Sequence, residues 1–236
     1  MNLVPVRDSH LGYISVSQIV DENPYRFRRP DLGAVETIRL SFLRSGQTHP
    51  MLLEAMDDGN FRVIDGHRRL DAVRAIYARG GFWPRVLAHV VTTHRPSALL
   101  HFLYIRNDGA RGFAPTELGR LLSWAQGAGL DARAIARETK LTLAEIDDLL
   151  EIAEAPDELG ALIDRTRLEP VFGAMLLRRF HAWTRTRNGP LAIGTAARII
   201  EQSRKSHITV KGFRFLLDFY WADDRPFMID IDRRQC

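Results

Sequence analysis

Cysteine is almost absent from the sequence: the only one among 236 residues is Cys236, the last. A single cysteine excludes an intrachain disulfide framework and a metal site built from several thiolates. Long apolar runs are also missing, since no stretch approaches the roughly 20 residues that a membrane-spanning helix needs. The first residues, MNLVPVRDSHLGYI, contain no basic segment followed by an apolar one, so we expect no secretory signal. These absences predict a cytoplasmic protein with no membrane partner.

The composition is that of an ordinary globular protein, with 45% hydrophobic and 26% charged residues. The length fits one large domain or two small ones. A formal charge of +4 is compatible with a polyanionic partner but does not require one.

The first hundred residues predict a mixture of strands and helices. Apolar residues at helical spacing predict a helix over 32–45, and HPMLLEAM, DDGN and FRVI predict a strand, a tight turn and a returning strand. A second helix is expected from Arg68 to the Gly80-Gly81 pair, followed by a strand in RVLAHVVTT.

Beyond about residue 95 the pattern is helical almost throughout. Two short helices are expected on either side of Lys140-Leu141, and Thr142 with Glu145 forms a capping-box pair at the start of the second. Helices this short and this closely joined predict a helix-turn-helix at about 131–154. We therefore expect an α+β protein with an α/β domain over 1–108 and a helical domain over 109–236.

The stretch FRVIDGHRRLDAVRAI changes from strand to helix at Gly66. The start of a helix presents free backbone N–H groups and partial positive charge, and Arg68 and Arg69 add two guanidinium groups beside it. This corner predicts a phosphate or other anion site. The alternative is that both arginines lie on a solvated first turn.

Three motifs in order resemble the N-terminal domain of ParB-type partition proteins: DENPYRFR, SGQTHPMLLE and FRVIDGHRRLDAV. Sulfiredoxins and a group of free-serine kinases share that fold. The segment IRNDGARGFAPTELGRLL, followed by a helix-turn-helix, is similar to the passage of ParB proteins into their DNA-binding domain. The resemblance covers roughly residues 10 to 165. It implies a ParB/sulfiredoxin-like nucleotide domain followed by a helical domain.

The resemblance implies a bound nucleotide, CTP or another nucleoside triphosphate, with Mg²⁺. Gly66, Arg68 and Arg69 match the segment with which ParB proteins grip the triphosphate. The remaining nucleotide-binding candidates are Gln47, Thr48, His49, Asp65, His67 and Asn107, the last as a ligand to metal or phosphate.

Two positions depart from the family pattern. His67 and Arg106 stand where ParB proteins have glutamates tied to the magnesium nucleotide and its hydrolysis. The loss of both carboxylates predicts nucleotide binding with weak or no hydrolysis. His67 as a general base is the weaker alternative to His67 as a phosphate contact. Sulfiredoxin chemistry is excluded, because its catalytic cysteine would stand at His67.

Two rival functions remain. The run from HPMLLEAM to GHRR also resembles the free-serine kinases, whose catalytic base would correspond to Glu22 of DENPYR. The enzyme class thus stays open between a CTPase and a nucleotide-dependent kinase. A non-catalytic protein-interaction module that keeps only the fold is the other rival.

The second half gives conflicting indications about DNA. The second helix of the expected helix-turn-helix, TLAEIDDLLEIAEA, is acidic and would repel phosphates. Basic residues gather further on, and we nominate as DNA-binding candidates Arg178, Arg179, Arg204, Lys205, Lys211 and Arg214. The expected role is plasmid partition or transcription regulation. The last residues do not resemble the ParB dimerisation domain, so a homodimer would pair differently or need further chain.

Overall fold

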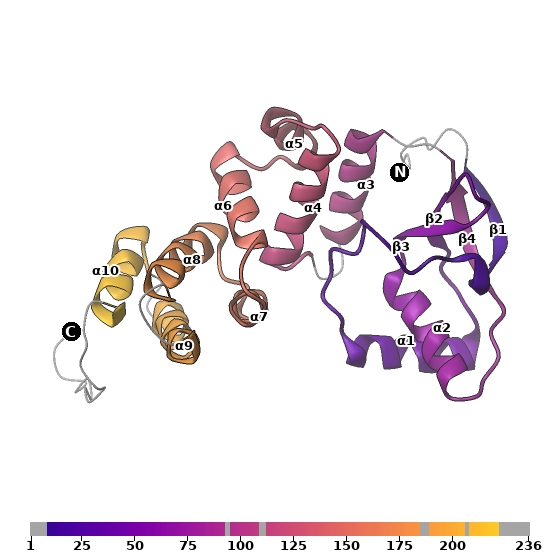
Figure 1. Cartoon of the computed structure of the whole chain (residues 1–236), viewed down its shortest axis with the longest axis horizontal. Helices are drawn as coiled ribbons and strands as arrows, with labels where there is room; N and C mark the ends of the chain where they lie inside the picture. Colours follow the sequence, from indigo (N-terminus) through magenta and orange to yellow (C-terminus); the bar gives the residue numbers. More distant parts are fainter. Residues whose placement is uncertain (1–8, 93–94, 109–111, 185–188, 206–207, 222–236) are drawn as a thin grey trace. The chain divides into compact units, whose positions relative to one another are not determined.

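The computed structural model describes residues 9–92, 95–108, 112–184, 189–205 and 208–221 (Figure 1). By its internal packing the chain forms two compact units, one up to Glu154 and one from Ala155. The predicted α+β class is confirmed, because a four-stranded sheet precedes a succession of helices. The predicted domain boundary after residue 108 stays a prediction.

The sheet contains β1 (Ser9–Ser15), β2 (Met51–Ala55), β3 (Phe61–Asp65) and β4 (Arg85–Val91), in the order β1-β4-β2-β3. β2 and β3 form an antiparallel hairpin around the predicted DDGN turn. β4 pairs with β2 in parallel and with β1 antiparallel. A short 3₁₀ helix, Val16–Gln18, follows β1.

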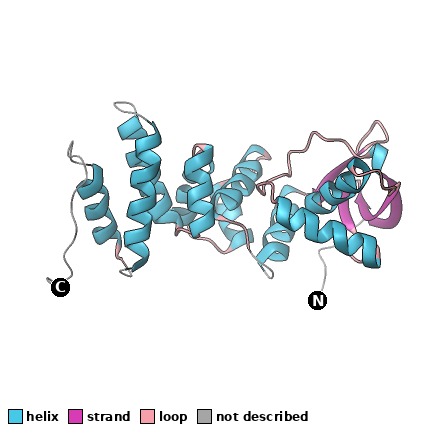
Figure 2. Cartoon of the chain, turned by 90° about the horizontal axis from the view of Figure 1, so that it is seen from below, coloured by secondary structure: helices cyan, strands magenta, loops and turns pink. Residues whose placement is uncertain are grey.

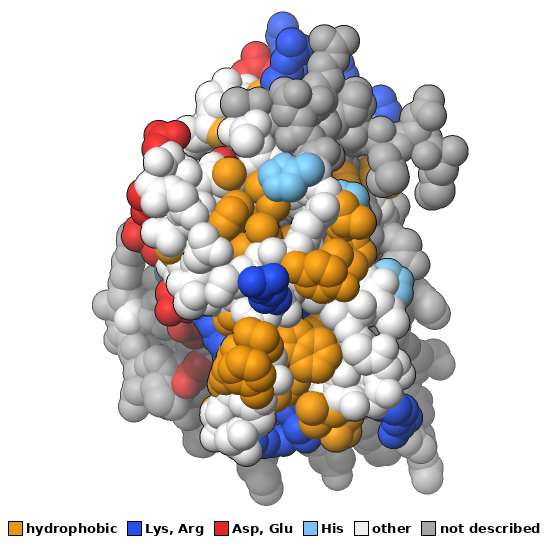
Figure 3. Space-filling view, turned by 90° about the vertical axis from the view of Figure 1, so that its right-hand side faces the viewer, with side chains coloured by type: hydrophobic (Ala, Val, Ile, Leu, Met, Phe, Trp, Pro, Cys, Tyr) orange, Lys and Arg blue, Asp and Glu red, His pale blue; other side chains and the backbone are white. Residues whose placement is uncertain are grey.

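Helices α1 (Leu32–Ser45) and α2 (His67–Ala78) lie together on one side of the sheet (Figure 1). Leu70, Val73 and Ile76 of α2 recur at helical spacing and pack with alternate residues of the strands, such as Leu53 and Val63. The opposite side of the sheet carries the exposed side chains of Leu11 and Tyr13, and Figure 3 shows hydrophobic side chains gathered on this part of the surface.

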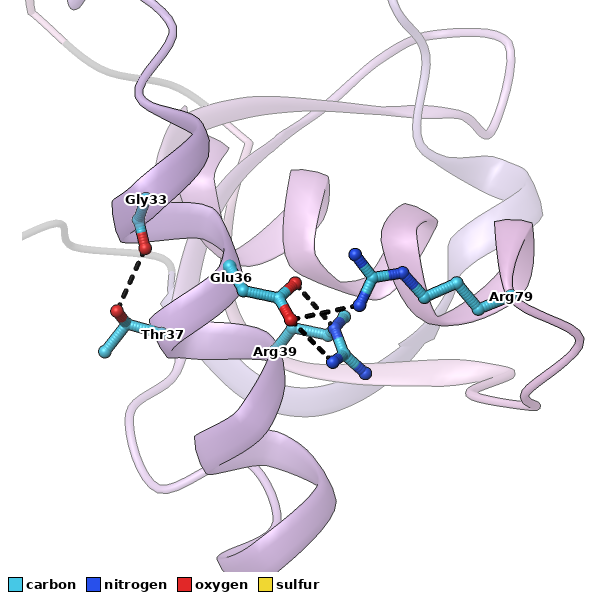
Figure 4. A network of polar contacts seen from close by, with 5 residues as sticks. All are labelled: Gly33, Glu36, Thr37, Arg39 and Arg79. Carbon is cyan, nitrogen blue, oxygen red and sulfur yellow. Dashed lines mark hydrogen bonds and ion pairs between the residues drawn. The ribbon is translucent and has the colours of Figure 1, made fainter.

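A network of polar contacts joins α1 to the end of α2 (Figure 4). The carboxylate of Glu36 accepts hydrogen bonds from Arg39 on its own helix, the shorter at 2.7 Å. It also accepts one from Arg79, just after α2, at 3.0 Å. These cations lower the pKa of Glu36 to about 2, the hydrogen bond from Arg39 having the largest effect.

The rest of the first unit is helical: α3 (Pro96–Asp108), α4 (Pro115–Gly127), α5 (Ala132–Thr139) and α6 (Leu143–Ala153). The predicted capping box is confirmed, since the Thr142 hydroxyl accepts from the Glu145 amide and the Glu145 carboxylate from the Thr142 amide. Lys140 ends α5 in a left-handed conformation, with φ of 64°. The three residues 140–142 thus connect two short helices, as predicted.

The second unit consists of α7 (Asp157–Thr166), α8 (Pro170–Thr184), α9 (Gly189–Lys205) and α10 (Val210–Trp221). Its core includes Phe172 of α8 stacked on Phe213 of α10, with ring centroids 4.7 Å apart. Figure 2 shows the described part of this unit as helices, in cyan. Within the described ranges no helix combines the length and the apolar character that crossing a bilayer would require.

Candidate functional site

The corner between β3 and α2 depends on Gly66. Its φ of 109° lies in the left-handed region that residues with a side chain rarely adopt. A Cβ atom there would also lie 2.9 Å from Cγ of Met51 on β2. The chain therefore turns tightly against the neighbouring strand, as the sequence pattern predicts.

The first turn of α2 is open to an anion. The amides of Arg69 and Leu70 both donate to the carbonyl oxygen of Gly66, at 2.8 and 3.0 Å. Helix geometry leaves the N–H groups of His67 and Arg68 directed out of the first turn, where the helix dipole is positive. These two amides can donate to a bound phosphate.

A cavity of about 240 Å³ lies at this corner. Five arginines and two aspartates contribute to its lining, so its charge is predominantly positive. The lining residues are Arg26, Arg28, Arg29, Pro30, Ile38, Asp65, Gly66, His67, Arg68, Arg69 and Asp71.

Three of the five arginines come from the loop before α1, and sequence reasoning did not assign them to the site. Arg26, Arg28 and Arg29 follow the Asn-Pro pair in the run NPYRFRR. The signal in the sequence was the density of arginine in the motif DENPYRFR. Its position beside Arg68 could not be read from separations of about 40 residues.

The loop is anchored at several points. Asn23 donates to the carbonyl oxygen of Val63 on β3 at 2.7 Å, and Tyr25 donates to Glu54 on β2 at 3.0 Å. Tyr25 and Phe27 pack against Trp124 of α4, with centroids 5.6 and 6.0 Å apart. Desolvation and the neighbouring Glu54 carboxylate raise the pKa of Tyr25 to about 12.

Buried Glu117 of α4 fixes the basic end of this loop. One carboxylate oxygen accepts from the Arg29 amide at 2.9 Å and the other from the Ala114 amide at 3.0 Å. Arg28 lies over the ring of Phe113, 5.1 Å from its centroid. The helical part of the first unit thus holds the loop arginines in place.

Arg69 and Arg68 differ in their partners. Arg69 donates to the carbonyl oxygens of His49 and Pro50 and forms an ion pair with Asp65 at 3.3 Å. Arg68 pairs with Asp31 at 3.4 Å, and its buried Nε has no hydrogen-bond partner in the described part of the chain. Arg69 therefore stabilises the corner, while the Nε–H group of Arg68 can donate to a ligand.

His67 lies among these cations. Burial lowers its pKa to about 4, and Arg26 contributes in the same direction. Asp65 and Asp71 act in the opposite direction but do not compensate. The imidazole is therefore neutral near pH 6.5, the ordinary pKa of histidine.

Several predicted nucleotide ligands lie outside the lining of this cavity. Gln47 lies in the loop that precedes β2 and attaches this loop to strand β4. Its side-chain amide donates to the Leu87 carbonyl at 2.7 Å and accepts from the Leu87 amide at 2.8 Å. The exposed side chains of Thr48 and His49 contact one another at 2.9 Å. Glu22 is exposed and is likewise not among the lining residues. Asn107 and Arg106 have side chains outside the described residues.

No group of three or more His, Cys, Asp or Glu side chains that could hold a metal ion occurs within the described ranges.

The predicted DNA-binding residues lie on three helices of the second unit. Arg178 and Arg204 are exposed on α8 and α9, and Lys211 and Arg214 are exposed on α10. Arg179 forms an ion pair with Asp218 of α10 at 3.3 Å. The side chain of Lys205 lies outside the described residues.

The first unit, with its mixed sheet, two covering helices and following helices, has the fold of ParB N-terminal domains. The chain matches the structure of a Pnob8-like ParB-N domain with a TM-score of 0.51 and 14% sequence identity, over 90% of this chain and 95% of that chain. At this identity the likeness shows the fold, and it confirms the predicted ParB-like fold.

Two C-terminally truncated ParB structures from Caulobacter crescentus also match, each at 14% identity. The one complexed to the centromeric parS site has a TM-score of 0.45, over 88% of this chain and 99% of that chain. The one complexed with CTP-gamma-S has a TM-score of 0.37, over 82% and 98%. No protein-family model and no curated protein matches the sequence.

Proposed function

We propose that the chain is a ParB-like nucleotide-binding protein, and that the cavity at the start of α2 binds the triphosphate of CTP or a related nucleotide. The observation that carries this proposal is the arginine-rich lining of that cavity, contributed by two segments that are distant in sequence. Guanidinium groups form bidentate, charge-assisted hydrogen bonds with phosphate, and they stay charged at any physiological pH.

Each part of the corner has a distinct role in this proposal. Gly66 allows phosphate to approach the backbone, and the amides of His67 and Arg68 donate to it. Arg68 would exchange its 3.4 Å contact with Asp31 for a phosphate oxygen. The loop arginines would close over the phosphates from the other side.

The site lacks a feature that hydrolysis of a bound nucleotide would use. The protein carries no carboxylate at His67 to hold the metal of a magnesium nucleotide, and the described residues offer no cluster to replace it. Mg²⁺ held by the phosphates alone would neither require nor use such a cluster. We therefore propose binding with weak or no hydrolysis.

Calorimetry with CTP, ATP and GTP tests the binding site, using Arg68→Ala as the variant. Loss of a hydrogen bond to a charged group costs about 1.5–3 kcal/mol, or about 10- to 100-fold in affinity. Arg74→Ala is the matched control, because Arg74 lies on the same helix, pairs with Asp21 at 2.5 Å and is not in the cavity lining. Equal affinities of the two variants would refute the assignment.

We also propose that the second unit contacts DNA through exposed basic residues of α8, α9 and α10. The acidic face of α6, with Glu145 and Asp147 exposed, opposes a reading role for that helix. Charge reversal of Lys211 and Arg214 should weaken DNA binding and reduce its dependence on salt. Arg44→Glu on α1 is a control with the same charge change as reversal of either residue alone.

The same experiments separate the rival functions. Formation of phosphoserine from serine and nucleotide, abolished by Glu22→Gln, would identify a kinase. Absence of binding to every nucleotide would leave a protein-interaction module.

A further inference from the structure

His67 is a buried titratable group inside the cationic cavity, and no role in the fold accounts for it. Its Nε2 is shielded from solvent and has no hydrogen-bond partner among the residues that the structure describes. The backbone of Val63 on β3 favours the protonated ring, but it does not outweigh burial. Native proteins seldom leave a buried polar atom unpaired without a functional reason.

Protonation determines what the ring can offer to an anion. The neutral ring has one N–H group and one lone pair, whereas the protonated ring carries an N–H group at both nitrogens and a positive charge. A lone pair repels the oxygens of a phosphate. The protonated ring is therefore more complementary to an anion in this cavity than the neutral ring.

Burial favours the neutral ring when the cavity holds no anion, and the charges around the ring act in both directions. Arg26 of the loop acts against protonation, while Asp65 at the end of β3 and Asp71 on α2 favour it. Asp71 is already paired with Arg26 at 2.6 Å, and Asp65 with Arg69 at 3.3 Å. The other charged groups that line the cavity are all cations: Arg28, Arg29 and Arg68.

We propose that His67 takes up a proton when a polyphosphate enters the cavity, so that nucleotide binding is coupled to protonation of this side chain. The inference rests on the proposed function, because the bound triphosphate supplies the negative charge. That charge offsets the guanidinium groups and stabilises the imidazolium.

The coupling has a defined sign. Below its pKa in the free protein, about 4, His67 is protonated with or without ligand and binding takes up no proton there. Between that value and the higher pKa of the complex, affinity falls by up to about tenfold for each unit of rising pH. Above both values the contribution of His67 to binding is lost.

Calorimetry of CTP binding at pH 6.5, in buffers of different ionisation enthalpy, counts the protons taken up. The γ-phosphate of CTP titrates as well, so the quantity of interest is the difference between the wild type and His67→Gln. We expect the wild type to take up more protons than the variant, by up to one per nucleotide. His89→Gln, an exposed histidine on β4, should behave as the wild type.

Ring resonances of the unmodified protein provide a second measurement that does not depend on the variant's folding. The titration midpoint of His67, with and without saturating CTP, should rise on binding. Equal proton counts in the wild type and His67→Gln, or an unchanged midpoint, would overturn the coupling while the binding site stands. Failure of CTP and inorganic tripolyphosphate to bind at any pH would overturn both proposals.

Discussion

Replacing Gly66 by alanine introduces two separable costs at the corner between β3 and α2. The new side chain must tolerate a φ of 109°, and its Cβ would lie 2.9 Å from Cγ and 3.2 Å from Cβ of Met51. Met51 is itself buried in the core of the sheet, so it has little room to withdraw.

The expected loss of stability follows from both costs. The left-handed backbone costs a residue with a side chain about 1–2 kcal/mol. Overpacking against a buried neighbour costs about 1–3 kcal/mol more. Together they predict that Gly66→Ala lowers the free energy of unfolding by about 2–5 kcal/mol.

Gly59→Ala isolates the backbone cost. Gly59 has a φ of 81° in the turn between β2 and β3, and a Cβ there would meet no atom within 4 Å. Only the left-handed strain applies, so the loss should be about 1–2 kcal/mol.

Urea unfolding of the wild type and both variants measures the difference, provided that the slope with denaturant is unchanged. Calorimetry with CTP on the folded fraction should show weaker binding for Gly66→Ala and unchanged binding for Gly59→Ala. If both variants lose the same stability and bind alike, the close approach at Gly66 has no energetic role and the reasoning fails.

Three further predictions concern the surrounding structure. Gly119→Ala in α4 should destabilise by about 1–3 kcal/mol, because its Cβ would collide with the Leu149 carbonyl of α6, whereas Gly127→Ala, with open space around it, should stabilise by up to about 1 kcal/mol in urea unfolding. Glu117→Gln should cost about 1–3 kcal/mol and weaken nucleotide binding, since an amide leaves the N–H group of Arg29 or Ala114 unpaired; a stability equal to wild type would contradict this. Glu36 has its pKa lowered from 4.5 to about 2, so its stabilising effect is complete above pH 4.5 and is lost as pH falls towards 2; the difference in thermal midpoint between wild type and Glu36→Gln should shrink over that range.

Local patterns predicted the elements well, because they depend on neighbours in sequence. The capping pair at Thr142, the DDGN turn between β2 and β3 and the glycine at the start of α2 are all encoded within a few residues. The same holds for Gly66, Arg68 and Arg69, which share one corner whatever the rest of the fold does.

The roles of residues predicted from a neighbouring motif could not be read from sequence, because the direction of each side chain depends on packing. Gln47 is expected beside the nucleotide, which stays a prediction, and the structure shows that its amide bonds both backbone groups of Leu87. The sequence alone does not distinguish a glutamine exposed on a loop from one whose amide bonds the backbone of a neighbouring strand.

By itself the sequence determined that a strand turns through Gly66 into a helix that begins with a histidine and two arginines. Only the tertiary structure decided that three more arginines, about 40 residues earlier, face that turn, that Arg69 is bound to backbone carbonyls while Arg68 is not, and that His67 is neutral. The physical reason is that charge and desolvation act through space, so an electrostatic site exists only once distant segments have packed together.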